Sequence, residues 1–232
     1  LYSARSEDDR KNEGLFRYVI SSNGARVTDI RERKTLFQAM IPKETTLSLL
    51  ERCKGQRLVT ASHMNNRYLL QGRMAAAAGR FIYGEDAKGI YCVRDMARTV
   101  KKSVFQTEEL QFYFLTKQSR QRLKAILELY PELSAAYTSI YAEVFSKNAS
   151  KGRALEALAG HLGITREETA CIGDGENDLS MFEASGFNIA MGNAFDGLKK
   201  KADYVTASNN REGAAKAVRR ILAAQRPVRR FV

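Results

Sequence analysis

The 232-residue sequence predicts an α/β fold in which a parallel-sheet core is interrupted by an inserted α+β domain. After residue 146, short apolar strands alternate with amphipathic helices, which is typical of a parallel sheet. Before that point, hairpins and helices are mixed, as in a separate α+β domain. We therefore expect a first core part at residues 1–34, the inserted domain at 35–146 and a second core part at 147–232.

The first 146 residues contain runs rich in β-branched and aromatic side chains, which favour strands. They predict strands at residues 17–20, 26–30, 57–61, 67–70, 111–115 and 137–145. The pair Asn65-Asn66 predicts a turn that joins two of these strands in a hairpin. Leucines at helical spacing predict helices over residues 45–53 and 119–129. The polar segment 3–12 is interpreted as the remainder of a helix, and the order of elements within 74–105 stays open.

The last part of the chain predicts a regular alternation of helices and strands. A helix over residues 151–162 has an apolar stripe that we expect to be buried, formed by Ala154, Leu155, Leu158, Ala159 and Leu162. Gly163 is the expected residue just past its end, and residues 165–168 resemble a capped helical turn. Strands are predicted at residues 169–172, 187–191 and 203–206, and further helices at 179–184 and 212–224.

Composition and charge exclude several classes of protein. Hydrophobic residues make up 44% of the chain and charged residues 28%, which excludes a disordered chain. No run of about 18 apolar residues occurs, so we expect no transmembrane helix. The net charge of +12 includes a basic C-terminal tail, but elsewhere basic residues alternate with acids, and we expect no nucleic-acid partner. The scattered Cys53, Cys92 and Cys171 argue against a zinc site and suit a reducing cytoplasm.

A glycine-flanked loop after the predicted strand at 169–172 carries the side chains best suited to chemistry. In a parallel sheet, ligands bind beyond the carboxyl ends of the strands, and Asp174 lies at such an end. Asn177 and Asp178 follow within the same loop. Carboxylate and amide oxygens are hard ligands of the kind that Mg²⁺ prefers. The alternative is purely structural, with a Gly-Asp-Gly turn and Asp178 as a helix cap.

Five short strings occur in one order along the chain. They are Ser22-Asn23-Gly24-Ala25, Ser150-Lys151-Gly152, Gly173-Asp174-Gly175-Glu176-Asn177-Asp178, Ala190-Met191-Gly192-Asn193-Ala194 and Ala202-Asp203-Tyr204-Val205-Thr206. Together they resemble the haloacid dehalogenase superfamily of phosphatases, in particular the Cof-type sugar-phosphate phosphatases with a large α/β cap. The resemblance implies a Rossmann-like core interrupted by a cap domain. It also implies Mg²⁺-dependent hydrolysis of a small phosphorylated substrate through an aspartyl-phosphate.

The resemblance also implies roles for individual residues. Asp174 is expected to be an Mg²⁺ ligand, and Asp178 to support either the metal shell or the nearby lysine. Lys151 is expected to neutralise the charge of phosphate and nucleophile, and Asn177 to contact the substrate phosphate. A lysine in the first turn of a helix is disfavoured by the helix dipole, which indicates an anionic partner. Asn23 either contacts the substrate or serves only the turn that contains it.

Within the region expected to form the cap, four residues are candidates for setting substrate choice, although they also fit an ordinary hairpin surface. They are His63, Asn65, Arg67 and Tyr68.

The family's nucleophile motif, Asp-x-Asp-Gly-Thr/Ser, is absent from the 232 residues, and so is the Ser or Thr motif of its next strand. The spacing in the family leads us to expect both motifs upstream of Leu1. We therefore expect that the chain as written cannot turn over a substrate. The alternative to a phosphatase is a catalytically silent anion-binding or interaction protein on the same fold.

Overall fold

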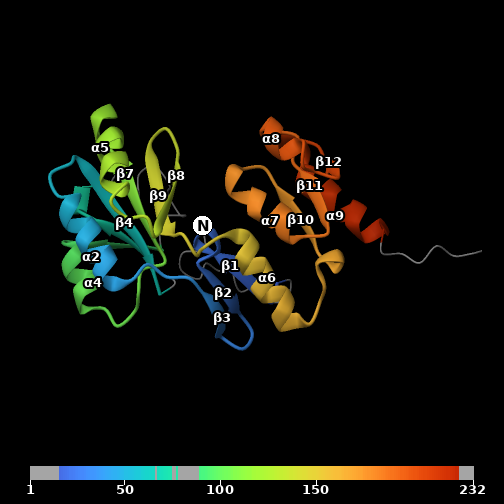
Figure 1. Cartoon of the computed structure of the whole chain (residues 1–232), viewed down its shortest axis with the longest axis horizontal. Coiled ribbons are helices and arrows are strands. Elements are labelled where there is room, and N and C mark those ends of the chain that lie inside the picture. Colours follow the sequence, from blue (N-terminus) through green and yellow to red (C-terminus); the bar gives the residue numbers. More distant parts are fainter. Residues whose placement is uncertain (1–15, 66, 75–76, 78–88, 225–232) are drawn as a thin grey trace, which may run out of the picture. The chain divides into compact units, whose positions relative to one another are not determined.

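The computed structural model describes residues 16–65, 67–74, 77 and 89–224. By its internal contacts the chain divides into two compact units, which we call unit 1 (Leu1–Ala149) and unit 2 (Ser150–Val232). Figure 1 labels their helices and strands. The expected helix remnant at 3–12 and much of the 74–105 region lie outside the described residues. The mixed α/β class predicted from the sequence is confirmed.

Unit 1 begins with a three-stranded antiparallel sheet in the order β1-β2-β3. Its strands are β1 (Tyr18–Ser21), β2 (Arg26–Asp29) and β3 (Lys34–Gln38). The first two match the predicted strands, whereas β3 was not predicted because its side chains are mostly exposed and lack a clear apolar pattern. The expected boundary at residue 35 falls inside β3, and the division into 1–34 and 35–146 stays a prediction.

A six-stranded sheet forms the larger part of unit 1, in the order β6-β5-β4-β7-β9-β8. Its strands are β4 (Leu58–Met64), β5 (Arg67–Gln71), β6 (Ile90–Val93), β7 (Glu109–Phe114), β8 (Leu133–Tyr137) and β9 (Tyr141–Ser146). β4 and β5 form the predicted hairpin, with Met64 opposite Arg67. Asn65 adopts a φ of 51° in the turn, a left-handed conformation that asparagine tolerates better than most residues.

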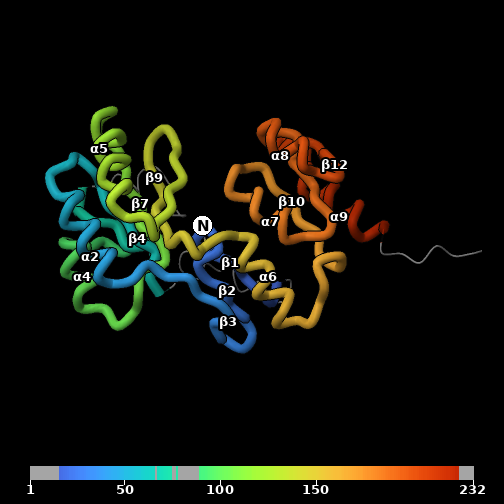
Figure 2. The backbone as a smooth tube through the Cα atoms, in the orientation of Figure 1, coloured from blue at the N-terminus to red at the C-terminus, as the bar shows by residue number. Residues whose placement is uncertain are grey.

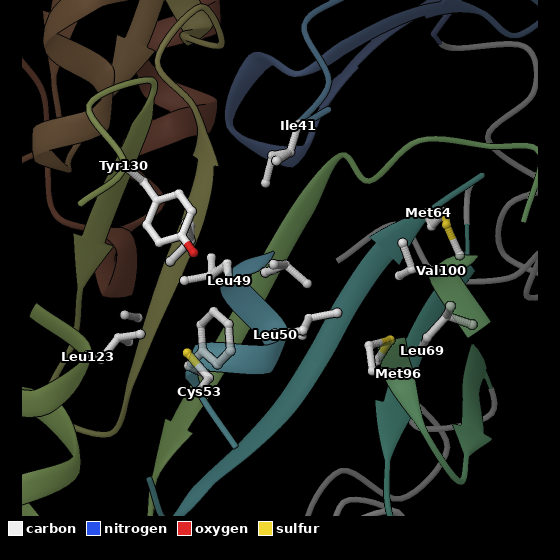
Figure 3. Close-up of a cluster of buried hydrophobic side chains, with 14 residues drawn as sticks. Ile41, Leu49, Leu50, Cys53, Met64, Leu69, Met96, Val100, Leu123 and Tyr130 are labelled. Carbon is white, nitrogen blue, oxygen red and sulfur yellow. The ribbon is translucent and has the colours of Figure 1, made fainter. Parts of the chain in front are cut away.

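Three helices supply the apolar core on one face of this sheet. They are α2 (Lys43–Arg52), α4 (Met96–Lys102) and α5 (Lys117–Leu127). Figure 3 shows the cluster, in which Leu49 and Leu50 of α2 lie close to Cys53. The side chains of β7 point alternately to the two faces of the sheet, as in any strand. Leu110 and Phe112 enter this cluster, whereas Tyr113 packs against a different cluster. The opposite face holds a smaller apolar cluster centred on Ala61, Tyr68 and Leu70, and β7 adds the buried polar side chains of Glu109 and Gln111 there.

The single long strand predicted over 137–145 is wrong. Residues 133–146 instead form the antiparallel hairpin of β8 and β9, in which Tyr137 lies opposite Ala142. The hydroxyl of Thr138 accepts hydrogen bonds from the amides of Ile140 (3.3 Å) and Tyr141 (3.0 Å), which turns the chain. A side chain that bonds to nearby backbone competes with the strand ladder, and a run of strand-forming residues does not reveal such a turn.

Unit 2 contains a parallel sheet in the order β10-β11-β12, which confirms the prediction for this part of the chain. Its strands are β10 (Ala170–Gly173), β11 (Phe187–Ala190) and β12 (Tyr204–Val205). Its helices are α6 (Lys151–Leu162), α7 (Leu179–Ala184), α8 (Asp196–Lys199) and α9 (Gly213–Ala224), with short 3₁₀ turns η3 (Arg166–Glu168), η4 (Glu176–Asp178) and η5 (Asn209–Arg211). Figure 2 follows the chain from α6 through β10 into α7.

The helix α6 begins and ends where the sequence predicted, and Gly163 ends it with a φ of 67°. The expected burial of its whole apolar stripe is wrong. Ala154 is fully buried, but Leu155 and Leu158 are only half-buried and Leu162 is 41% exposed. None of the helices among the described residues is long and apolar enough to cross a membrane.

Candidate active site

The loop between β10 and α7 wraps around the buried carboxylate of Asp178. The oxygen Oδ2 of Asp178 accepts hydrogen bonds from the backbone amides of Asp174 (2.9 Å) and Gly175 (3.0 Å). The chain comes so close that a Cβ at Gly173 would lie 2.6 Å from the Cβ of Asp178. Glycine at this position therefore allows the strand end to fold over the carboxylate.

Lys151 reaches the same carboxylate from the first turn of α6. Its Nζ lies 2.6 Å from Oδ1 of Asp178, and the lysine side chain is 29% exposed. Ser150 caps the helix, since its hydroxyl accepts a hydrogen bond from the amide of Arg153 (3.1 Å). The two oxygens of Asp178 are thus engaged by one ammonium group and two backbone amides.

The position of Lys151 depends on close packing between the starts of α6 and α7. The amide of Gly152 donates to the hydroxyl of Ser180 (3.1 Å). A Cβ at Gly152 would lie only 2.1 Å from the carbonyl oxygen of Ser180. The first turn of α6 therefore lies directly on α7, next to the turn that carries Asp178.

Asp178 is ionised in this setting. Burial alone would raise the pKa of its carboxyl, but hydrogen bonds from Lys151 and from the amides of Gly175 and Asp174 outweigh burial and hold the pKa below its ordinary value. The pair of Lys151 and Asp178 is therefore a fixed, partly buried ion pair. The ammonium group of Lys151 is held by Asp178 but the side chain remains partly exposed, so it can still attract an anion.

Asp174 differs from Asp178 because its carboxylate is exposed. Its Oδ2 accepts a hydrogen bond from Nδ2 of Asn193 (3.0 Å), a residue of the loop after β11. Oδ1 of Asn193 in turn accepts from the amide of Asn209, after β12 (2.9 Å). The loops that follow the three parallel strands are thus tied together by one chain of hydrogen bonds. Sites in parallel sheets form at this edge.

These residues fit an Mg²⁺ site in part. Mg²⁺ is commonly held by one or two carboxylates, with waters and substrate phosphate completing the shell. Asp174 offers such an exposed carboxylate. In the described part of the chain, however, no group of three or more His, Cys, Asp or Glu side chains could hold a metal ion. The contacts of Asp178 favour the second of its two expected roles, support of the lysine, and its role as a metal ligand stays a prediction.

The two asparagines expected to bind substrate lie in different units. Asn177 is exposed in η4, beside Asp178, as a phosphate contact requires. Asn23 lies in the β1–β2 turn of unit 1, where its Nδ2 donates to Oε2 of Glu109 and to Oε2 of Glu143, both at 2.9 Å. These contacts tie the turn to β7 and β9, and the substrate role of Asn23 stays a prediction.

Two of the four residues considered for substrate choice pack against each other. The rings of His63 and Tyr68 meet edge to face, with centroids 4.9 Å apart. Tyr68 is buried, and its hydroxyl donates to Oε1 of Gln111 (2.9 Å). Burial lowers the pKa of His63 to about 4, so the imidazole is neutral at physiological pH. A neutral ring packed in this way is a weak candidate for binding phosphate.

Sequence reasoning missed Asn193 and Ser180. Asn193 belongs to one of the quoted strings and lies two residues after the strand predicted at 187–191, which was the available signal. Ser180 gave no signal, because its role arises from the packing of α6 on α7, which no local pattern encodes.

A family model described as haloacid dehalogenase-like hydrolase matches residues 6–218. The chain is 49% identical over 80 residues to phosphatase YwpJ of Bacillus subtilis, which covers 34% of this chain and 28% of that protein. It is 40% identical over 109 residues to the 5-amino-6-(5-phospho-D-ribitylamino)uracil phosphatase YwtE of the same organism, covering 47% of this chain and 37% of that protein. The chain thus matches only about a third of the length of these relatives.

Solved structures give a broader match. A haloacid dehalogenase-like hydrolase from B. subtilis superposes with a TM-score of 0.75 at 25% identity. The match covers 90% of this chain and 81% of that one, so the likeness includes residues of both units.

Proposed function

The chain belongs to the haloacid dehalogenase-like hydrolases, and from that premise we propose that the protein is an Mg²⁺-dependent phosphatase acting on a small phosphorylated metabolite. The observation that carries the proposal is the pair of Lys151 and Asp178 beside the exposed Asp174, at the carboxyl end of β10. A fixed cation next to an available carboxylate suits a site that binds phosphate and a divalent ion. The similar YwtE is named for a phosphorylated ribityl compound, which supports a sugar phosphate as the substrate class.

In this proposal each residue acts through its charge or through a hydrogen bond. Lys151 attracts the phosphoryl group and stabilises the charge that develops on its oxygens, the main form of catalysis in phosphoryl transfer. Asp178 holds the ammonium group of Lys151 in place and directs it, and is a positioning residue. Asn177 donates to a phosphoryl oxygen from the exposed turn η4.

Asp174 would hold Mg²⁺, with Asn193 orienting its carboxylate. When bound, the ion supplies charge neutralisation to the phosphoryl oxygens.

The phosphoryl group would pass from the substrate oxygen to an aspartate carboxylate, which releases the substrate's alcohol. Water would then hydrolyse the aspartyl-phosphate to inorganic phosphate and free aspartate. No Asp-x-Asp-Gly string occurs in the 232 residues, so we propose that this nucleophile belongs to sequence upstream of Leu1. We also propose that residues 35–146 act as a cap that excludes water from the reacting groups. A cytoplasmic location is in keeping with Cys53, Cys92 and Cys171, which are all free thiols.

The test uses two proteins, this chain and a longer form that includes the coding sequence upstream of Leu1. Hydrolysis of p-nitrophenyl phosphate is measured with Mg²⁺ and with a chelator. The proposal expects Mg²⁺-dependent turnover by the longer form and none by the chain alone. A longer form that carries the motif but binds phosphate without hydrolysing it would instead favour the catalytically silent anion-binding protein.

A further inference from the structure

A cavity of about 440 Å³ lies in unit 1, and none of the residues that line it belongs to the candidate active site. It is lined by the end of α2, the start of β4 and the loop between β6 and α4. Leu50 and Cys53, which are labelled in Figure 3, contribute apolar surface. Its volume falls in the range of about 300–1,000 Å³ that is usual for small-molecule sites.

The charged side chains that line the cavity are mostly cationic. Lys54, Arg57 and Arg94 contribute positive charge, against the single carboxylate of Asp95. That carboxylate is already in use, because its Oδ1 accepts a hydrogen bond from the amide of Arg98 (2.9 Å) and caps α4. Lys54 pairs with Glu51 at the surface. Neither guanidinium makes a hydrogen bond or ion pair with any residue that the structure describes.

The side chain of Thr60 also lines the cavity. Thr60 of β4 is only 7% exposed, and its hydroxyl makes no hydrogen bond within the described ranges of the chain. A ligand oxygen in the cavity could accept from this hydroxyl.

The wall of the cavity is held by backbone contacts. The carbonyl of Arg57 accepts from the amide of Leu115 (3.2 Å) and from the hydroxyl of Ser119 (2.8 Å). These bonds connect the start of β4 to the segment after β7 and to α5. The backbone from which the side chain of Arg57 extends is therefore held in place.

We propose that this cavity binds a small phosphorylated metabolite at a site separate from the candidate active site. Two guanidinium groups, one ammonium group and a hydroxyl offer many donors, and a phosphate dianion offers several acceptor oxygens and two charges. A single carboxylate would use fewer of these donors. The inference does not depend on the proposed phosphatase activity, because it concerns different residues and a binding step only.

The test is calorimetric titration of the whole chain with inorganic phosphate. Arg57→Gln and Arg94→Gln each remove a charge from an exposed side chain, so folding should be preserved. Each should weaken phosphate binding at this site about tenfold, the loss expected for one charge-assisted hydrogen bond. Arg98→Gln is the matched control, because it removes the same charge from an exposed position of α4 that does not line the cavity. It should leave the affinity unchanged.

Two further variants separate this site from its alternatives. Thr60→Val removes only the unpartnered hydroxyl, so it should weaken phosphate binding without lowering the unfolding temperature. Lys151→Gln should leave the cavity site intact, because it alters unit 2 alone. Phosphate binding that survives the Arg57→Gln/Arg94→Gln double variant unchanged, or that Lys151→Gln alone abolishes, would overturn the proposal. So would tight binding of citrate in the absence of phosphate binding.

Discussion

At the scale of single residues, the candidate site is organised around one buried carboxylate. Asp178 uses one oxygen to hold the ammonium of Lys151 and the other to hold the loop that presents Asp174. Charge and loop shape therefore depend on the same side chain. Substitutions at Lys151 and Asp174 test the two functions separately, because one carries the cation and the other carries the exposed carboxylate.

Lys151→Ala should lower kcat by about 100-fold or more in protein that contains the nucleophile motif, the usual cost of losing one charge-stabilising group. It should also lower the free energy of unfolding by about 1–2 kcal/mol, because Asp178 loses a charged partner. Lys151→Arg should rescue poorly, since a broad guanidinium does not replace a compact ammonium. The exposed Lys147→Ala is the control, and kcat is measured with a phosphate monoester. Near-normal kcat in Lys151→Ala would require a different cation at the site.

Asp174→Asn should weaken Mg²⁺ binding at least about tenfold, because a neutral amide replaces a charged ligand, and even changes to groups around a metal ligand typically cost 10–100-fold. Calorimetry on the protein with an intact nucleophile motif measures this affinity. Asp196→Asn, in an exposed position of α8, removes an equal charge elsewhere in unit 2. Equal Mg²⁺ affinity in both variants would remove Asp174 from the metal site.

At the scale of elements, the parts predicted best from sequence are those set by local pattern. The bounds of α6 follow from the cap by Ser150, from Gly163 and from the spacing of apolar side chains. Both α6 and α7 were predicted at their observed positions. The β8–β9 turn was missed, because it depends on one hydroxyl of Thr138 within a run that favours strands. The loop with Asp174 and Asp178 was recognised from its string, but the link from Asp174 to Asn193 arises only when parallel strands align.

Two glycines of α6 offer a matched test of how this helix packs on α7. Gly152→Ala should destabilise the protein by about 1–3 kcal/mol, because the new methyl would collide with the backbone of Ser180. Gly160→Ala meets open space in the same helix and should stabilise it by about 0.5–1 kcal/mol. Urea denaturation gives both values. If the two variants changed stability in the same direction, α6 would not pack on α7 as described.

At the scale of the whole molecule, buried acids link stability to pH. Glu109 is 3% exposed; burial, together with the charge of Glu143, raises its pKa to about 7, although hydrogen bonds from Gln111 and Asn23 oppose the rise. The folded state therefore holds this proton more tightly than the unfolded state. The stability that results is fully present below the ordinary pKa of 4.5 and is lost as pH rises through about 7.

The wild-type protein should thus lose free energy of unfolding, on the order of 3 kcal/mol from this group, between pH 4.5 and 8. The Glu109→Gln variant has no carboxyl group to titrate at this position, so its free energy of unfolding should lack this decrease with pH. The lowered pKa of His63 acts in the opposite direction below pH 6.5, but it is shared by both proteins and cancels in their difference. Denaturation curves at several pH values give the slopes. Parallel slopes for the two proteins would show that Glu109 does not titrate in this range.

We expect the β1–β2 turn to be a site of chemical ageing by deamidation. Asparagine followed by glycine loses its amide nitrogen readily, because glycine does not hinder the ring closure that precedes hydrolysis, and Asn23 precedes Gly24. Its amide donates to both Glu109 and Glu143, so deamidation would replace a donor by a third carboxylate facing two others. Asn23→Asp should reproduce that damage and destabilise unit 1, which unfolding measurements on stored and fresh protein, paired with intact-mass analysis, would reveal.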